Sequence, residues 1–70
     1  MAVIKVIELV GESSESWDDA VRQAVREASR TLRNISGVEV LNWTGSIDEN
    51  GDIADYKADV QIAFRVDSNR

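Results

Sequence analysis

A lysine between two aspartates is the first group in this 70-residue sequence that could do chemistry. Asp55, Lys57 and Asp59 alternate, so their side chains share one face of an extended strand. Two carboxylates can divide acid and base roles in a dry pocket, and a desolvated lysine can form a Schiff base. The flanking aspartates favour the charged, unreactive lysine, and an open strand face leaves the carboxylates solvated. We therefore expect no catalysis here and predict that the protein is not an enzyme.

A second group of candidate ligands falls in one short acidic turn. Its side-chain oxygens suit hard cations such as Ca²⁺ and come from Asp48, Glu49, Asn50 and Asp52. Their spacing is not that of an EF-hand loop. A solvated hairpin turn explains the same residues, because Asn50 and Gly51 are a pair that readily adopts positive φ. Calcium binding stays open as the weaker alternative.

Arginines recur at helical spacing near the middle of the chain, as Arg22, Arg26, Arg30 and Arg33. Guanidinium groups bind phosphates bidentately, so this stripe could hold a phosphate-bearing ligand where helices of neighbouring copies meet. The plainer alternative is a solvated face with ion pairs across subunits, and Asp18 lies one turn before Arg22.

The composition excludes several other kinds of site. The chain has no cysteine and no histidine, which removes thiol nucleophiles, Ser-His-Asp triads, disulfides and nearly every zinc site. Its net charge of −5 disfavours nucleic acid and anionic membranes as partners. Lys5 and Glu8 interrupt the apolar start, and no window resembles a membrane span. We place the protein in the cytoplasm.

Residues 1–70 are expected to form one domain with the order strand, helix, strand, strand. Residues 2–10 are rich in β-branched side chains and are stopped by Gly11, which predicts a strand buried on much of both faces. The helix is expected to begin near Ser16, a capping residue, and to end at Ser36 and Gly37. Its apolar stripe has three- and four-residue steps: Trp17, Ala20, Val21, Ala24, Val25, Ala28, Leu32 and Ile35.

Two further strands are expected to form a hairpin. The second begins at Val38, and its apolar pattern changes phase, which indicates a bulge near Val40 or two covered faces. Residues 48–52 make the turn, and residues 53–66 alternate cleanly, so one face of the third strand should meet the helix. Trp17 is expected in the core and Trp43 at a subunit interface.

The lengths of these elements indicate self-assembly. A 14-residue strand is about 47 Å long, whereas a 19-residue helix is only about 29 Å long. One helix therefore cannot cover its own sheet, and the exposed apolar side chains should be covered by other copies of the chain.

Five separated blocks of the sequence resemble the dodecin family: residues 5–11, 16–21, 31–35, 38–40 and 63–66. The resemblance covers nearly the whole chain. It implies an α+β fold with β-α-β-β order, in which a three-stranded antiparallel sheet with the third strand in the centre wraps around one helix. It also implies a hollow homododecamer that stores flavin (riboflavin, FMN or FAD) in pairs between subunits and is not an enzyme.

The same resemblance assigns the small-molecule site to Gly37, Val38, Lys57 and Arg65. Gly37 stands where flavin-binding dodecins have a tryptophan that stacks on the flavin, and Lys57 stands where they have a glutamine. Thr44 occupies a position that is often basic, and Arg65 is retained. The first hypothesis is therefore a flavin or flavin-like storage protein. The alternative is a shell that has lost flavin and is calcium-binding or structural. Coenzyme A, found at subunit junctions in some dodecins, is the candidate ligand for the arginine stripe.

Overall fold

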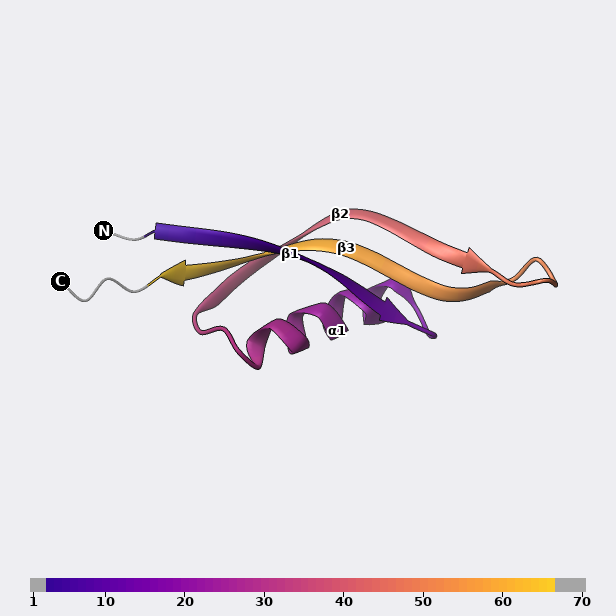
Figure 1. Ribbon diagram of the computed structural model, residues 1–70, viewed down its shortest axis with the longest axis horizontal. Helices are drawn as coiled ribbons and strands as arrows, with labels where there is room; N and C mark the ends of the chain where they lie inside the picture. Colours follow the sequence, from indigo (N-terminus) through magenta and orange to yellow (C-terminus); the bar gives the residue numbers. More distant parts are fainter. Residues whose placement is uncertain (1–2, 67–70) are drawn as a thin grey trace.

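Three strands form one antiparallel sheet, and a single helix lies against one of its faces (Figure 1). The computed structural model describes residues 3–66. The outer strands β1 (Val3–Ser13) and β2 (Ile35–Ile47) flank the central β3 (Ile53–Val66), and α1 (Trp17–Ser29) follows β1. The α+β fold and the central position of the third strand are thereby confirmed. No helix within residues 3–66 is long and apolar enough to cross a membrane.

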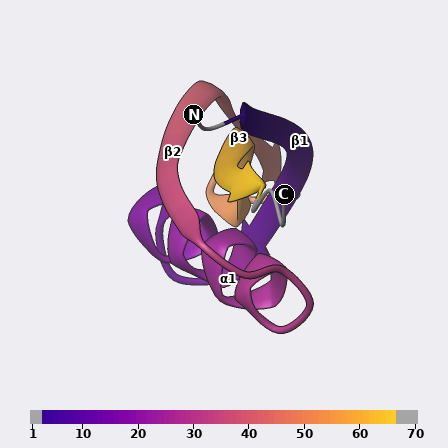
Figure 2. The same ribbon diagram turned by 90° about the vertical axis from the view of Figure 1, so that its left-hand side faces the viewer.

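The core lies between α1 and the face of the sheet that it covers, which we call the inner face. In end view, β1 and β2 arch to either side of β3 above the helix (Figure 2). The buried side chains are small or β-branched, and only 0–4% of each is exposed: Ala20, Ala24, Ala28, Ala58, Val60 and Ile62. The helical alanines recur every four residues, so α1 approaches the sheet closely along one stripe.

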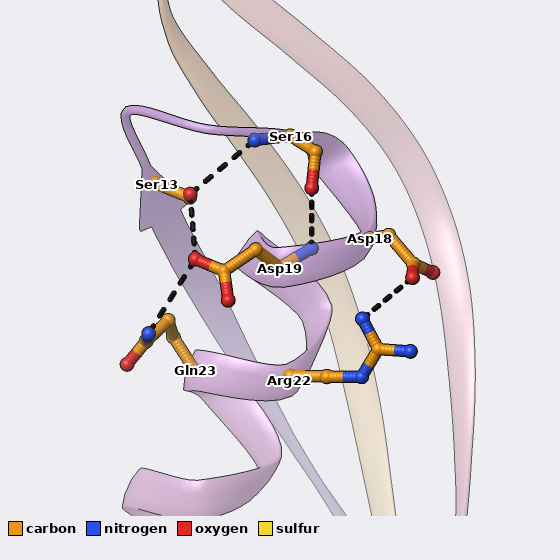
Figure 3. Close-up of polar contacts among 6 residues, drawn as sticks. All are labelled: Ser13, Ser16, Asp18, Asp19, Arg22 and Gln23. Atoms are coloured by element: carbon orange, nitrogen blue, oxygen red, sulfur yellow. Dashed lines mark hydrogen bonds and ion pairs between the residues drawn. The ribbon is translucent and has the colours of Figure 1, made fainter.

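Local hydrogen bonds fix the start of α1, as the capping signal at Ser16 predicts (Figure 3). The Ser16 hydroxyl accepts a hydrogen bond from the Asp19 backbone N–H at 3.0 Å, which satisfies a free donor of the first turn. The Ser13 hydroxyl donates to Asp19 Oδ2 at 2.7 Å and accepts from the Glu15 backbone N–H at 2.9 Å. One serine thus ties the end of β1 to the helix.

The expected end of the helix is wrong. Helix α1 ends at Ser29, and β2 begins at Ile35 rather than at Val38. The chain turns through Asn34, which has a φ of 63° and so provides the left-handed conformation expected of Gly37. Leu32 and Ile35 still pack on the core, but from the turn and from β2. The apolar spacing of the helix therefore runs on to Leu32 and Ile35, although both residues lie beyond the end of the helix.

The hairpin and the bulge are confirmed. Asp48 Oδ1 accepts hydrogen bonds from the backbone N–H groups of Asn50 and Asp52, and Gly51 has a φ of 84°. The register of β2 against β3 shifts between Val40 and Asn42. This bulge turns Trp43 to the inner face, opposite Ala58, instead of the face that a regular pleat would give it.

The outer face of the sheet, which points away from α1, is not covered by this chain. The prediction that the first strand is buried on both faces is therefore wrong for a single copy, since Val6 and Val10 are exposed. A 13-residue helix is about 20 Å long, whereas the molecule measures 58 Å along its longest axis. The turn of the β2–β3 hairpin extends well beyond the helix (Figure 1).

Candidate functional site

Gly37 borders a shallow hollow on the outer face of the sheet. Both Gly37 and Val6 pair with Ala63 of β3, so that small and apolar residues form one row across the three strands. The hollow has a volume of about 180 Å³ and is lined by Val6, Gly37, Val38, Glu39, Gln61 and Ala63. A Cβ atom placed on Gly37 would have no atom within 4 Å. The position is therefore open to a ligand or to a larger side chain.

Polar groups surround this apolar row. Gln61 and Glu39 pair with each other in the next row, where they offer an amide and a carboxylate. Arg65 lies two residues from Ala63 on the same face, about 7 Å along β3. It lines an adjoining hollow of about 360 Å³ with Ile4, Asn34, Ile35 and Ser36. A flat ligand lying on Val6, Ala63 and Gly37 would have the amide of Gln61 and the carboxylate of Glu39 at one edge. The guanidinium of Arg65 would lie toward its opposite edge.

Lys57 lies elsewhere on the outer face. It pairs with Glu12 and Thr44, six residues from Ala63, which is about 20 Å along the strand. Its Nζ is 3.8 Å from Asp55 Oδ2 and 3.3 Å from the Ser46 hydroxyl. One chain thus brings Gly37, Val38 and Arg65 into one area and leaves Lys57 outside it, so that only another copy could bring Lys57 to Gly37.

Two carboxyl groups that the sequence reasoning did not pair lie close together on this face. The pKa of Glu8 is raised, chiefly by a hydrogen bond to Asp59 and by the charge of that carboxylate. Asp59 Oδ1 is itself buried without a hydrogen-bond partner. The sequence gives no signal for this pair, because it depends on the register of β1 against β3. Within residues 3–66, no group of three acidic side chains is placed to hold a metal ion.

Two of the four arginines in the stripe form ion pairs with acidic residues of the same chain. Arg22 Nη1 lies 2.6 Å from Asp18 Oδ2 (Figure 3), and Arg30 Nη1 lies 3.0 Å from Glu27 Oε1. The pair of Arg22 with Asp18 agrees with their spacing of one helical turn, and the ion pairs expected across subunits stay a prediction. Arg22 and Arg26 also line a groove between α1 and β2.

The two tryptophans form one aromatic cluster at the hairpin end of the helix. Trp17 stacks on Trp43 with ring centroids 5.5 Å apart, and the ring of Tyr56 meets Trp17 edge-on at 4.8 Å. The Trp17 indole N–H donates to the Thr44 carbonyl at 2.8 Å. Trp17 is only half-buried, and Trp43 is 55% exposed. Trp43 lies too far along β2 to replace an aromatic ring at Gly37 within one chain.

Comparison with known proteins gives one consistent result. A family model described as Dodecin matches residues 3–67. The chain is 35% identical over 65 residues to the dodecin of Thermus thermophilus, covering 93% of each protein. It is 30% identical over 66 residues to the calcium dodecin of Mycobacterium tuberculosis, covering 94% of this chain and 92% of that protein.

Solved structures agree with these relatives. The dodecin from Streptomyces coelicolor has a TM-score of 0.90 with this chain at 35% identity, over 97% of this chain and 96% of that one. The crystal structure of the Mycobacterium tuberculosis calcium dodecin has a TM-score of 0.80 at 28% identity, with the same coverage of 97% and 96%.

Proposed function

This chain belongs to the dodecin family, and we propose that it is a non-enzymatic cytoplasmic protein whose twelve copies form a hollow shell that stores a flavin-like ligand. The observation that carries this proposal is the open hollow at Gly37 on the uncovered face of the sheet. An apolar floor with a few polar groups at its edge is the usual form of a small-molecule site. In one chain the hollow is only a half-site, and a second copy would close it.

The side chains around the hollow fit the parts of such a ligand. A bound flavin would supply a flat ring system with carbonyl and ring-nitrogen groups at one edge. Gln61 could donate and accept hydrogen bonds at this edge. The Arg65 guanidinium is near enough to bind a phosphate, which FMN has and riboflavin lacks. Lys57 would take part only from a neighbouring copy.

Assembly is supported by the amount of apolar surface that the chain leaves exposed. Large side chains on β1 are more than half exposed, including Val3, Ile4, Val6 and Val10. Exposed apolar surface of this extent is typical of a protein–protein interface. Native mass spectrometry of the purified protein is the first test: a twelve-subunit mass with flavin-sized increments is expected, and a monomer would contradict the proposal.

The missing stacking partner gives a sharper test. Gly37→Trp should raise the affinity for riboflavin and FMN about 5- to 150-fold, because stacking of one ring on an aromatic side chain contributes roughly 1–3 kcal/mol. Asn42→Trp, on the same strand and face but outside the hollow, is the matched control. Quenching of flavin fluorescence measures both. No gain for Gly37→Trp over the control would show that this hollow does not accept the ring.

The phosphate contact can be tested separately. Arg65→Gln should weaken FMN binding and leave riboflavin binding unchanged, since only FMN carries the charge that Arg65 would bind. An equal loss for both ligands would contradict the assigned role of Arg65.

Calcium binding is the second candidate, favoured by the 30% identity to a calcium dodecin. Residues 3–66 of one copy provide no group of three acidic ligands, so a site would need side chains from two copies. Native mass spectra in calcium and in a chelator distinguish the candidates. Calcium-sized increments with no response to flavin would favour the second.

A further inference from the structure

The turn of the β2–β3 hairpin contains an asparagine followed by a glycine, and both residues are exposed to water well beyond the helix (Figure 1). The side-chain amide of an asparagine can be attacked by the backbone nitrogen of the next residue, and a bulky side chain on that residue hinders the attack. After Asn50 comes Gly51, which has no side chain. A Cβ placed on Gly51 would have no atom within 4 Å, so the position is free of such hindrance.

Two other asparagines provide a comparison within the chain. Asn34 is followed by Ile35 and Asn42 by Trp43, so a β-branched or aromatic side chain stands beside the nitrogen that would attack. Both of these following residues also belong to β2, where pairing with β3 holds the backbone. In the part of the chain that the structure describes, Asn50 is therefore the asparagine best placed for this reaction.

Asp48 restrains the turn through both its backbone and its side chain. The Gly51 N–H donates to the Asp48 carbonyl at 3.1 Å, and the Asp48 N–H donates to the Asp52 carbonyl at 2.8 Å. Asp48 Oδ1 accepts from the backbone N–H groups of Asn50 at 2.9 Å and Asp52 at 3.0 Å. The attacking nitrogen of Gly51 must therefore leave Asp48 before it can approach the side chain of Asn50.

We propose that Asn50 is a site of spontaneous covalent modification, an intramolecular deamidation, and that Asp48 limits its rate. Hydroxide removes the proton of the Gly51 N–H, and the nitrogen forms a bond to Asn50 Cγ. The Cγ–Nδ2 bond breaks, and Nδ2 takes up a proton and leaves as ammonia. Water then opens the cyclic imide at either carbonyl and leaves an aspartate or an isoaspartate at position 50. One water is consumed and one ammonia is released, without oxidation or reduction.

The reaction changes both the charge and the length of the turn. A carboxylate at position 50 joins those of Asp48, Glu49 and Asp52, and like charges so close together repel each other. In the isoaspartate the main chain passes through the former side chain and is one atom longer. This shifts Gly51 and Asp52 relative to Asp48 and breaks hydrogen bonds that join them. Modification therefore loosens the end of the hairpin as the protein ages.

Ageing of the purified protein tests the site. After incubation at mildly alkaline pH, peptide mapping by mass spectrometry should show a gain of about 1 Da at Asn50, with isoaspartate among the products. Asn34 and Asn42 are controls within the same chain and should stay unchanged. Asn50→Gln should abolish the gain, because its longer side chain would have to close a larger and less favourable ring.

Variants at Asp48 test what limits the rate. Asp48→Ala should deamidate about tenfold faster than the wild type, because the loss of two hydrogen bonds makes the turn easier to open. Asp48→Asn keeps an acceptor oxygen and should stay within about threefold of the wild type. Glu49→Ala is the matched control: it removes a carboxylate of the same turn, but not one that accepts these hydrogen bonds. These residues lie outside the hydrophobic core, and far-UV circular dichroism checks that each variant is folded.

The outcomes decide both parts of this inference. An aged wild type with Asn50 unchanged, or with an earlier gain at Asn34 or Asn42, would overturn the site. Equal rates for the wild type and Asp48→Ala would overturn the role of Asp48, and so would an equal acceleration in Glu49→Ala, which would attribute the effect to charge. The reaction takes place within one chain, so a wild-type monomer would contradict the proposed function and leave this inference standing.

Discussion

The inner and outer faces of the sheet differ in what surrounds their side chains. On the inner face, Ala58, Val60 and Ile62 of β3 are fully buried against α1. On the outer face, Val6 and Val10 of β1 are 51% and 62% exposed and alternate with Glu8. The contacts of a single chain therefore make one face a core and leave the other free for ligands and for other copies. Substitutions that act on one face and spare the other test this division.

The largest difference between the two faces is the space available for a side chain at a glycine position. A Cβ on Gly11 would lie 2.0 Å from the Ala20 carbonyl oxygen and 3.1 Å from Ala24 Cβ, whereas a Cβ on Gly37 would meet nothing within 4 Å. Gly11→Val should therefore push α1 from the sheet and lower the free energy of unfolding by about 3 kcal/mol or more. Gly37→Val should change it by less than about 0.5 kcal/mol.

Urea unfolding followed by far-UV circular dichroism measures this pair, at one protein concentration because assembly adds to apparent stability. Equal losses for the two variants would mean that the outer face is packed as tightly as the inner one.

The link between β1 and α1 should give an intermediate effect. Ser13→Ala removes the acceptor for the Glu15 N–H and the donor to Asp19, which should lower stability by about 1–2 kcal/mol near neutral pH. The Ser13 hydrogen bond is also the main reason that the pKa of Asp19 is lowered from 3.8. Such a carboxyl stabilises the fold above pH 3.8, and this stability is lost as the pH falls through the folded-state pKa.

The difference in the free energy of unfolding between wild type and Ser13→Ala should accordingly become smaller below pH 3.8. Ser14→Ala, an exposed neighbour, is the control. A gap that stays constant with pH would contradict the link between Ser13 and the ionisation of Asp19.

The outer face should show the smallest effect, with the opposite dependence on pH. The pKa of Glu8 is raised above 4.5 by Asp59, so the folded state binds more protons than the unfolded state, and stability falls as the pH rises above 4.5. Glu8→Gln keeps a hydrogen-bond donor toward Asp59 and removes the charge. The stability of this variant should therefore fall less steeply with rising pH than that of the wild type. Thermal unfolding between pH 4 and 7 measures it, with Glu12→Gln as the control on the same strand and face. An unchanged slope would show that the two carboxyls are not coupled.

Features set by neighbours in the sequence could be predicted well. Ser16 caps the helix, Asn50 and Gly51 belong to the hairpin turn, and the even-numbered apolar residues of β3 face the core. The end of the helix was not predictable in this way. Leu32 and Ile35 continue the helical spacing, yet Leu32 packs on the core from the turn before Asn34, and Ile35 packs on it from β2 after the chain has reversed at Asn34.

The candidate site depended on the sequence only in part. The resemblance assigns Gly37, Val38, Lys57 and Arg65 to a site lined by facing subunits, which stays a prediction. Within one chain, the register of the sheet separates Lys57 from Gly37 by about 20 Å. It also brings Glu8 beside Asp59, which no spacing in the sequence indicates. Register depends on the bulge between Val40 and Asn42, and a shift of one residue exchanges the faces of the residues beyond it.

The sequence by itself determined the order of elements, the capping of α1, the hairpin and the family, because each is encoded by neighbouring residues or by a pattern along the chain. Only the tertiary structure decided which residues share a site, where the helix ends and which apolar side chains remain exposed. These features depend on how β1 and β2 align with β3, and that alignment is selected by the packing of the whole chain.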